Sequence, residues 1–485
     1  MKKILNITIL TIMLWAISTF IISNQTQKEF QKQINRSNKV YTKNGLQLTL
    51  SNYQKSFLES NATIEIDVID PILSKKLKKD FLFPIKIHYN IEHGPLFFKN
   101  NFDFGVSKLN NRLLLSSILR PNVKKRFLEM VKDDIEITSD MVIAFNRELK
   151  YNIYSSKIHI DDNKIEYDIS PIKINGAVDI RTLKGDAKLY VKKYKYKYKS
   201  DNLTLDKLAI DVKIDEILDK NIIFGDFIFS IGNILYTMPK SKFNRVNIGL
   251  NGEVINKKLT QKTMSSSFMT NIDLKDTTLP KEYKELKNVH LAIDMIDLGI
   301  EGMSQIQQTL KVSQKKQNRL MKELQLTKAK DISHLLLERQ KIKEVMMANI
   351  IHSLNALLIK DKTYVTYALD MDTKDKSVSS ASVELGYTGD MEFKGRVKEL
   401  TKKVQSQILS LIRMNVDIEL DKKHIKLIPA NHLSQQLQMG VTQGFVKDNN
   451  SSYSLNGYYK DKQLMVNDKN LTATILPLLM MLTAQ

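Results

Sequence analysis

Alternation of apolar and polar side chains runs through most of the first 300 residues and constrains the chain to a β-rich fold. Segments such as Gly45–Gln54, Phe83–Glu92 and Asn288–Asp297 place an apolar or aromatic side chain at every second position. Successive side chains of a strand point to opposite faces, so these segments predict strands with one apolar and one polar face. Short polar turns separate them instead of helices of crossover length, which predicts an antiparallel meander.

The pattern changes at Gly302, where helical spacing replaces alternation. From Met303 to Ile359 there is neither Gly nor Pro, and the larger aliphatic residues fall near one helical face. A single helix of that length would extend about 85 Å at 1.5 Å per residue, so we expect a break near Asp331 and a hairpin or layer that covers the sheet. The polar stretch Ser313–Arg319 is expected at its exposed tip, and the apolar second half is expected to be buried.

Together these patterns predict an α+β fold dominated by strands. We expect a long antiparallel meander sheet, curved and groove-like, with a helical insertion and a smaller C-terminal α+β part, preceded by one N-terminal transmembrane helix. The expected divisions are a signal anchor at 1–24, a β-rich periplasmic region at 25–300, a helical layer or hairpin at 301–360 and a C-terminal α+β region at 361–485. The final apolar residues, LTATILPLLMMLTAQ, are too few to cross a bilayer, so we expect them to dock into the body.

The N-terminus indicates the compartment. After Lys2 and Lys3, the stretch Ile4–Ile22 carries no charge and approaches the roughly 20 residues that span a bilayer. The preceding positive charges favour a cytoplasmic start and export of the rest of the chain. A cleaved signal peptide, processed near Ala16–Ser18, is the alternative, although apolar residues continue beyond that site and favour a retained anchor. We expect a single-pass protein of the bacterial inner membrane with its bulk in the periplasm, raised on a polar stem at 24–38.

The charge balance indicates an anionic partner. The net charge is +21, from 74 basic and 53 acidic residues. Nucleic acid fits such a charge in general, but an exported chain does not meet it. Outside the inner membrane the abundant anions are lipid head groups and envelope polysaccharides, and a basic segment near an anionic membrane gains about 1 kcal/mol per Lys or Arg. We therefore expect a membrane partner through residues 4–22, with anionic lipids as further partners, and no nucleic acid.

One strand-like run, KKYKYKYKS, places tyrosines and lysines at alternating positions. As a strand it presents Tyr194, Tyr196 and Tyr198 on one face, which we expect to lie on the covered side of the sheet. The other face presents a row of basic side chains, namely Lys193, Lys195, Lys197 and Lys199. Two interpretations of these lysines remain open: contacts with lipid head groups, or an outer strand kept soluble and unpaired.

Known catalytic and metal-binding signatures do not match this sequence. Without any cysteine the chain has no disulfide, thiolate nucleophile or cysteine metal site. The segment Asp370–Asp375 resembles the start of a calcium loop, but its sixth position is not Gly and its twelfth, Ala381, is no bidentate acid. Nucleophile elbows, zinc-protease helices and phosphate-binding loops do not occur either. We therefore predict a non-enzymatic protein with no catalytic residue, no cofactor and no bound metal.

Two motifs carry a family resemblance. His93-Gly94-Pro95 follows a predicted strand, and residues 433–469 read LSQQLQMGVTQGFVKDNNSSYSLNGYYKDKQLMVNDK. With the single N-terminal anchor and the long β-rich middle, these motifs resemble the YdgA-like family of bacterial envelope proteins, a domain of unknown function. The resemblance spans nearly the whole chain. It implies an envelope location and carries over no catalytic residues; the sequence Asn467-Asp468-Lys469 departs from the glycine turn usual in the family's last hairpin.

His93-Gly94-Pro95 is also interpretable without chemistry. Gly94 permits a backbone conformation that other residues avoid, and Pro95 lacks a ladder donor, so the motif predicts the end of a strand. A ligand or metal on His93 is the alternative. His88, five residues earlier, lies on the opposite face of an extended strand, which favours the turn.

Three asparagines lie in N-x-S/T sequences with an acidic residue two positions earlier. They are Asn61, Asn450 and Asn470, preceded by Glu59, Asp448 and Asp468. This spacing resembles the extended sequon of bacterial periplasmic glycosylation systems, so we treat the three as candidate modification sites.

Two functions remain for such a chain. The first is a membrane-anchored, non-enzymatic protein that binds lipid or other hydrophobic envelope material along the apolar face of its sheet. The alternative is an envelope scaffold whose helices at 303–359 bind a protein partner that supports surface structures or motility.

Overall fold

The computed structural model describes residues 2–97, 103–131, 133–162, 165–218, 222–238, 245–275, 285–326, 332–389, 392–394, 399, 410–427 and 433–473. The side chains of residues 2–14, 40, 322, 324–326, 332 and 433 fall outside this description. The chain forms two compact units, which we describe separately. Unit 1 comprises residues 1–213 and 230–244, and unit 2 comprises residues 214–229 and 245–485. Strands β13 (Asp201–Leu218) and β14 (Ile222–Thr237) carry residues of both units.

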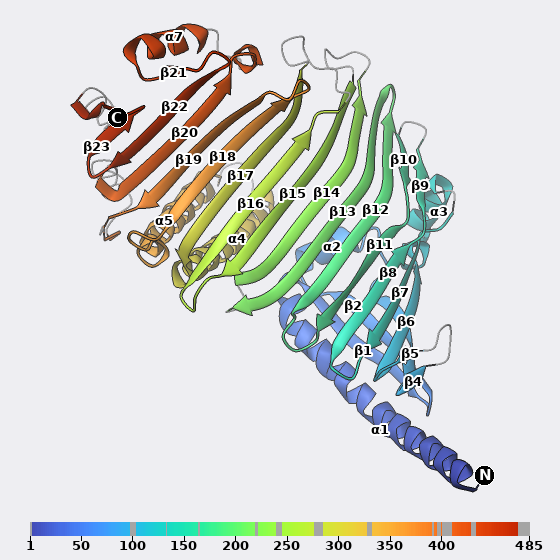
Figure 1. Cartoon of the computed structure of the whole chain (residues 1–485). Coiled ribbons are helices and arrows are strands. Elements are labelled where there is room, and N and C mark those ends of the chain that lie inside the picture. Colours follow the sequence, from blue (N-terminus) through green and yellow to red (C-terminus); the bar gives the residue numbers. More distant parts are fainter. Residues whose placement is uncertain are drawn as a thin grey trace. The chain divides into compact units, whose positions relative to one another are not determined.

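Unit 1 is built on antiparallel strands, as the alternation predicts (Figure 1). Hydrogen-bonded neighbours run in the order β1 (Leu46–Lys55), β2 (Glu59–Val68), β3 (Ile85–His93), β6 (Ser107–Leu114), β7 (Glu136–Ile143), β8 (Glu148–Ser155), β11 (Ile172–Asp179) and β12 (Gly185–Tyr198). The second half of β12 pairs with β10 (Ile165–Ile169), which pairs with β9 (Ile158–Asp161). A separate ribbon joins β4 (Leu96–Phe97) to β5 (Asp103–Phe104). Short helices α2 (Pro71–Leu77) and α3 (Pro121–Met130), with 3-10 turns at Thr42–Asn44 and Leu115–Ile118, complete the unit.

Helix α1 (Lys2–Tyr41) includes the predicted stem, for which a helical or flexible segment was expected, so its helical form is confirmed. Its expected separation from the body is wrong, because it packs against these strands. The ring of Phe30 lies 6.1 Å from the ring of Tyr89 in β3, and Ile34 is buried. The side-chain amide of Asn38 donates to the carbonyl oxygen of Leu48 and accepts from its N–H, both at 2.8 Å, as a neighbouring strand would. This pairing covers the edge of β1. Phe30 and Ile34 give the otherwise polar segment an apolar stripe, which is why it docks.

The core of unit 1 lies between α1 and the strands beneath it. Ala62, Ile91 and Leu109 are buried there, and Phe30 packs against them. Among the described residues, the length and hydropathy needed to cross a membrane do not coincide in any helix.

Unit 2 repeats the antiparallel order. Its strands run as β15 (Arg245–Lys258), β16 (Thr263–Asp273), β17 (Leu286–Gly299), β18 (Tyr364–Thr373), β19 (Val378–Tyr387), β20 (Ile412–Asp421), β22 (Ser452–Lys460), β23 (Gln463–Val466) and β24 (Lys469–Asn470). The short β21 (Lys447–Asp448) pairs with β22. The predicted β-dominated antiparallel fold is therefore confirmed.

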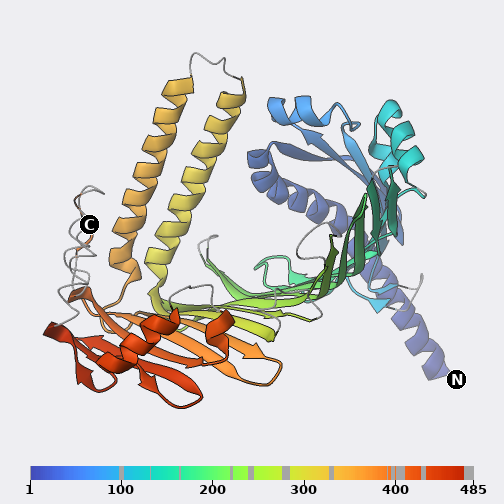
Figure 2. The same cartoon turned by 90° about the horizontal axis from the view of Figure 1, so that it is seen from above.

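Helices α4 (Ile300–Leu326) and α5 (Ile332–Leu357) confirm the predicted break near Asp331. They lie side by side and extend away from the sheet of unit 2 (Figure 2). The predicted tip is wrong in position, because Ser313–Arg319 lies inside α4, whereas the expected exposure holds for most of the stretch and fails at the buried Ser313. The expected burial of the second half holds only in part, since Leu336 and Leu337 of α5 are exposed.

Only the base of this hairpin packs against the sheet. Leu298, Ile300 and Leu357 are buried together with Ile222 and Phe224, and they form the main core of unit 2. The close approach depends on Gly299 and Gly302. A Cβ on Gly299 would lie 1.8 Å from the carbonyl oxygen of Ala356, and one on Gly302 would lie 2.3 Å from the backbone nitrogen of Leu357.

The C-terminal hairpin is tight despite its unusual turn. Asn467 and Asp468 both take positive φ, 45° and 68°, and Val466 pairs with Lys469. Positive φ at both central positions gives the turn that matches strand twist, and Asn and Asp tolerate it better than most residues. Helix α7 (Leu433–Gln443) precedes this hairpin, after a 3-10 turn at His424–Leu427. The expected docking of the terminal segment falls outside the described residues after Ala473.

Candidate functional site: an open apolar sheet face

The strand register of unit 2 aligns apolar residues into rows across one face. Directly paired residues of antiparallel strands point to the same side, so a chain of pairs from β15 to β20 traces a row. One row comprises Val254, Phe268, Ile293, Tyr367, Val383 and Val416. The row beside it comprises Thr270, Leu291, Leu369, Ala381 and Ile418. These two rows, which we call the apolar rows, contain no charged residue.

The apolar rows are open. None of their residues is buried, and Tyr367 and Leu369 are 45% and 39% exposed. Large apolar side chains in a packed core are normally almost fully buried. Within the described part of the chain, the face therefore lacks the covering layer that the helical spacing of 303–359 predicted.

Covered regions bound the rows on two sides. Toward one end of the strands, Met295 packs against the hairpin base with Met303 and Leu354. Toward β22 and β23, Tyr459 and Leu464 belong to a second buried cluster. The uncovered apolar strip therefore lies between two buried regions.

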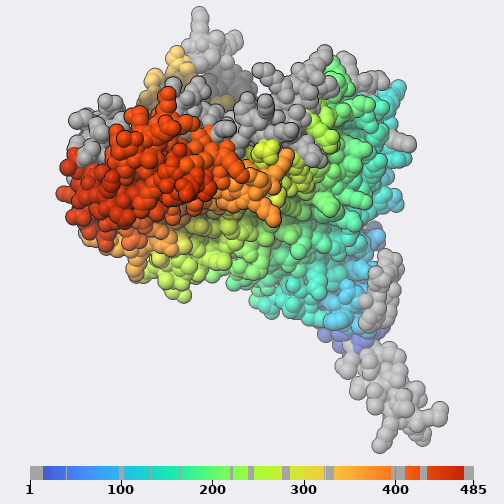
Figure 3. All heavy atoms as spheres, turned by 45° about the horizontal axis from the view of Figure 1, so that its top comes forward, coloured from blue at the N-terminus to red at the C-terminus, as the bar shows by residue number. Residues whose placement is uncertain are grey.

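The opposite face of the same strands is acidic. Asp294 pairs with Thr366, which pairs with Glu384, and Asp370 and Asp417 lie on the same side in neighbouring rows. Figure 3 shows the residues of unit 2 from β15 onward as a sequence of colours from yellow-green to red. The two faces of unit 2 therefore differ in charge: one is acidic and the other carries the uncharged apolar rows, although the whole chain has a net charge of +21.

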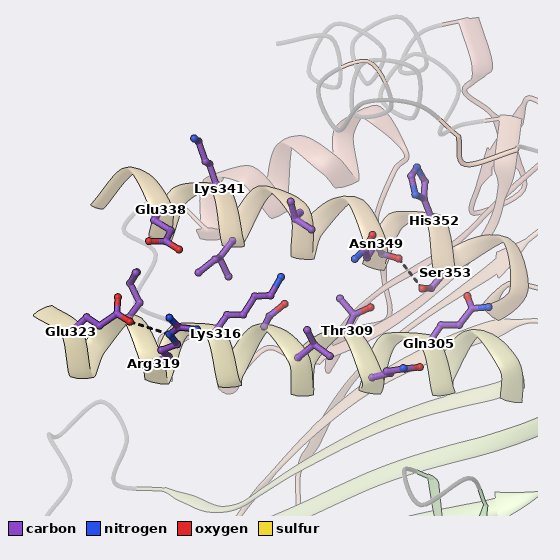
Figure 4. Close-up of a pocket in the computed structure, with 16 residues that line it drawn as sticks. Gln305, Thr309, Lys316, Arg319, Glu323, Glu338, Lys341, Asn349, His352 and Ser353 are labelled. Atoms are coloured by element: carbon purple, nitrogen blue, oxygen red, sulfur yellow. Dashed lines mark hydrogen bonds and ion pairs between the residues drawn. The ribbon is translucent and has the colours of Figure 1, made fainter. Parts of the chain in front are cut away.

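A groove of about 900 Å³ lies between α4 and α5 in unit 2. Most of the residues that line it carry polar side chains, and Lys316 and Asn349 face the space between the helices (Figure 4). Arg319 is paired with Glu323 at 3.0 Å, and the hydroxyl of Ser353 donates to the carbonyl oxygen of Asn349 at 2.7 Å. The polar stretch that was expected at the tip thus lines an interhelical groove.

A smaller hollow of about 430 Å³ lies on the acidic face. There the side-chain amide of Asn415 donates to Glu384 at 3.1 Å, beside Asp417 and Tyr458. Across the described residues, no three His, Asp or Glu side chains gather in a way that could hold a metal ion.

His93 is a buried structural residue in unit 1. Its Nε2 is hydrogen-bonded to the hydroxyl of Ser60 at 2.8 Å, and its Nδ1 lies 3.4 Å from the hydroxyl of Thr26 in α1. Burial, with a smaller contribution from the charge of Lys55, lowers the pKa of His93 to about 4. β3 ends at His93, and Gly94-Pro95 is a cis peptide, so the predicted strand end is confirmed.

A second buried histidine carries no signal in the sequence that predicts its role. His424 is fully buried, with Nδ1 hydrogen-bonded to Ser379 at 2.6 Å and Nε2 hydrogen-bonded to Ser377 at 2.9 Å. Asp375 accepts from the hydroxyl of Ser377 at 3.0 Å and is paired with Lys423. The order of contacts differs from a serine–histidine–acid relay, because a serine lies on each side of His424 and the carboxylate of Asp375 contacts Ser377. The cluster holds the β18–β19 turn to the 3-10 segment that follows β20.

The tyrosine and lysine faces of β12 are as predicted in the second half of that strand. Tyr194, Tyr196 and Tyr198 pair with Ile169, Tyr167 and Ile165 of β10, and the rings of Tyr167 and Tyr196 lie 5.1 Å apart. On the other face, Lys195 and Lys197 pair with Asp168 and Glu166. Lys193 and Lys197 have carboxylates 3.9 Å away, at Asp206 and Glu166. Lys199 lies in the turn after the strand, with its ammonium 5.1 Å from the ring of Tyr198.

The three candidate glycosylation asparagines are all exposed. Asn61 lies within β2, Asn450 lies in a turn with a φ of 62°, and Asn470 lies in β24. The three belong to separate elements, and glycosylation of each remains a prediction.

A comparison with protein families identifies the family of this chain. A family model described as "Bacterial protein of unknown function (DUF945)" matches residues 1–474. The chain belongs to this family. Searches of curated proteins and of solved structures returned no match. Membership in the DUF945 family is compatible with the YdgA-like resemblance noted from the sequence and assigns no activity.

Proposed function

We propose that this DUF945 protein is anchored in the bacterial inner membrane by Ile4–Ile22 and binds lipid acyl chains, or similar hydrophobic envelope material, along the apolar rows of unit 2. It has no catalytic activity of its own in this proposal. The observation that carries it is the charge-free, uncovered pair of rows around Tyr367 and Leu369. The uncharged N-terminal stretch and the resemblance to YdgA-like envelope proteins support the location.

The size of the strip fits an acyl chain. Five spacings of about 4.8 Å between β15 and β20 give a row about 24 Å long. One leaflet of a bilayer holds acyl chains in about half of its 30 Å hydrocarbon core. A chain lying along a row would therefore fit within it, and each fully buried methylene contributes about 0.8 kcal/mol.

The absence of charge in the rows defines the ligand class. A polar or charged ligand would lose its hydration on this face without gaining a partner within the rows. An apolar chain gains from contact with Phe268, Ile293 and Leu291 and has no hydration of polar groups to lose. The acidic opposite face disfavours an anionic lipid there, which makes the ligand site one-sided.

Paired substitutions on β18 test the proposal, because its successive residues point to opposite faces. Tyr367→Gln with Leu369→Gln alters the apolar rows, and Thr366→Gln with Ala368→Gln alters the acidic face of the same strand. We expect the first pair to abolish binding of a fluorescent fatty acid and to remove lipid seen by native mass spectrometry. The second pair should retain both. Equal binding by the two variants would refute the site, provided that both unfold in urea like the unsubstituted protein.

The scaffold alternative is favoured by a different observation. The α4–α5 hairpin extends from unit 2 with Leu336, Leu337 and Val345 exposed beside an open groove. Surface apolar residues of this kind mark contact sites for other proteins. Leu336→Gln with Leu337→Gln should then abolish cross-linking of α5 to an envelope protein and leave fatty-acid binding unchanged. Undiminished cross-linking would eliminate this alternative.

A further inference from the structure

Several turns of unit 1 lie together at one end of its strands. In the described part of the chain, the connections at 56–58, 94–97 with 103–106, 144–147 and 180–184 follow β1, β3, β7 and β11. Backbone hydrogen bonds join neighbours among them: the N–H of His93 donates to Leu58 at 2.8 Å, that of Val106 to Ile143 at 2.7 Å, and that of Ile180 to Arg147 at 3.2 Å. We call this edge the turn end.

Each connection of the turn end presents a large apolar side chain to solvent. The exposed fractions are 42% for Phe57, 46% for Leu58, 63% for Phe104, 54% for Phe145 and 55% for Leu183. Basic residues accompany them, with Lys55, Arg147 and Arg181 all exposed. The acidic residues Asp103 and Asp179 accept hydrogen bonds from backbone amides of their own turns.

Helix α1 passes the turn end in direct contact. The hydroxyl of Ser23 donates to the carbonyl oxygen of Ser56 at 3.0 Å, and the rings of Trp15 and Phe57 meet edge-on at 6.4 Å. The ammonium of Lys55 lies 5.6 Å from the ring of Phe20. Beyond this contact, the N-terminal part of α1 extends past the strands (Figure 1).

The contact between Trp15 and Phe57 determines how deep the β1–β2 turn lies in a membrane that α1 crosses. Trp15 precedes Ile22 by seven residues, which is about 10 Å along a helix axis. If Ile4–Ile22 is the membrane anchor, Trp15 lies below the membrane surface, and the Phe57 ring that touches it must lie there too. A water-exposed β1–β2 turn is therefore incompatible with the full length of the anchor.

We propose that the turn end is a membrane-docking edge that holds unit 1 against the bilayer around α1. Phe57 and Leu58 enter the boundary of the hydrocarbon, Phe104 and Phe145 lie at head-group level, and the basic side chains meet lipid phosphates. Aromatic residues with Lys and Arg are the composition found at membrane interfaces, which favours a lipid surface over a protein partner. The inference rests on the proposed anchor and adds an orientation to it.

The opposite end of the strands offers a competing surface. Helix α3 lies there, with Leu128 42% exposed and Lys124, Lys125 and Arg126 around it. Its basic, amphipathic character suits an anionic membrane as well. The matched exposure of Phe57 and Leu128 makes the pair a direct comparison between the two ends.

The absence of cysteine permits unique labelling of the full-length protein. Single substitutions Phe57→Cys, Leu58→Cys and Leu128→Cys would each carry an environment-sensitive nitrobenzoxadiazole label after reconstitution into phosphatidylglycerol–phosphatidylethanolamine vesicles. We expect labels at 57 and 58 to emit at shorter wavelength and to lose emission when lipids carry a doxyl quencher, whereas the label at 128 stays unchanged.

Each other outcome overturns a defined part of the inference. The protein could resist alkaline extraction from vesicles while the labels at 57 and 58 emit as they do in water. This result would support the anchor and refute the docking edge. Quenching of the label at 128 instead would show that unit 1 docks through α3. Complete extraction at alkaline pH refutes the anchor and the docking edge together. The Phe57 and Leu58 positions check each other, because a misfolded variant would not reproduce its neighbour's result.

Discussion

Gly94 and Gly105 approach so closely that a Cβ on Gly94 would lie 1.7 Å from the carbonyl oxygen of Gly105. The N–H of Gly94 donates to Val106 at 2.9 Å, and the N–H of Gly105 donates to Pro95 at 3.1 Å. The His-Gly-Pro motif thus closes the β3–β6 connection through backbone contacts in which a side chain has no space. Its role in the fold follows from this geometry without any chemistry at His93.

Gly94→Ala should strongly destabilise unit 1. The added methyl group meets backbone atoms, which cannot move aside as a side chain would, so we expect a loss of about 3 kcal/mol in the free energy of unfolding. Urea denaturation measures this loss. Gly457→Ala is the control, because a Cβ there has its nearest neighbour at 3.6 Å; similar losses for both variants would contradict the close-approach argument.

His93 should make the stability of unit 1 depend on pH. The pKa of His93 falls from 6.5 to about 4 in the folded unit, so between these values the unfolded chain binds a proton that the folded chain does not. Stability is therefore full above pH 6.5 and falls as the pH decreases toward 4, by about 3 kcal/mol from this residue. Denaturation in urea at pH 7, 5.5 and 4.5 measures the slope.

A variant without a titrating group isolates the contribution of His93. His93→Gln retains an amide that can bond Ser60 and Thr26, and we expect it to flatten the decline in stability between pH 6.5 and pH 4. The other histidines contribute equally to both proteins and cancel in the difference. An unchanged slope would mean that His93 is protonated as readily in the folded unit as in the unfolded chain.

The strands were predictable because their signal is local. Alternation at Ile85–Glu92 and in the Tyr194–Tyr198 run specifies both the extended backbone and the two faces, and the observed register agrees. The covering of those faces is not local. Apolar rows require residues from strands far apart in sequence, and nothing in Tyr367 or Leu369 alone distinguishes an open face from a core.

Polar stretches are poor guides to position in the fold for a related reason. The composition of Asn24–Asn38 predicts a stem, yet Phe30 and Ile34 suffice to dock it. That of Ser313–Arg319 predicts a tip, yet the stretch faces α5 across a polar groove. The role of His424 does not follow from the sequence, because its partners Ser377 and Ser379 lie more than forty positions earlier.

Ser379→Ala should destabilise unit 2 by about 1–3 kcal/mol, the usual cost of leaving buried polar groups without partners. The Ser379 hydroxyl bonds His424 and also accepts from the N–H of Asp421 at 2.9 Å. Ser380→Ala, which alters the neighbouring position on the acidic face, should cost much less. Both variants should bind fatty acid normally, because the cluster is structural; lost binding with intact folding would assign the cluster a role in the site.

Glycosylation, if the host supplies it, should favour Asn450 over Asn61. Asn450 lies in an exposed turn, whereas Asn61 lies within β2, where the backbone is paired with strands on both sides. The third sequon residues, Ser452 and Thr63, are both buried, so the difference between the two sites is in the backbone around the asparagine. A transferase that acts on the folded chain needs a flexible, accessible segment. Intact-mass measurement should show that Asn450→Gln removes most of the added glycan and that Asn61→Gln removes little; the reverse would indicate modification before folding.

The lysines of β12 and the turn end are two candidate membrane contacts of unit 1, and they lie far apart along the strand. Gly185, where β12 begins, lies beside the turn end, and Tyr198 lies thirteen residues along the strand, about 43 Å away at 3.3 Å per residue. A unit docked through Phe57 and Leu58 therefore holds Lys193–Lys199 far from that bilayer, and carboxylates already lie near Lys193 and Lys197. We expect replacement of Lys193, Lys195, Lys197 and Lys199 by Gln to leave vesicle association unchanged and solubility reduced. A weakened association would instead support head-group contacts at the lysine face and would place that end of β12 at the membrane.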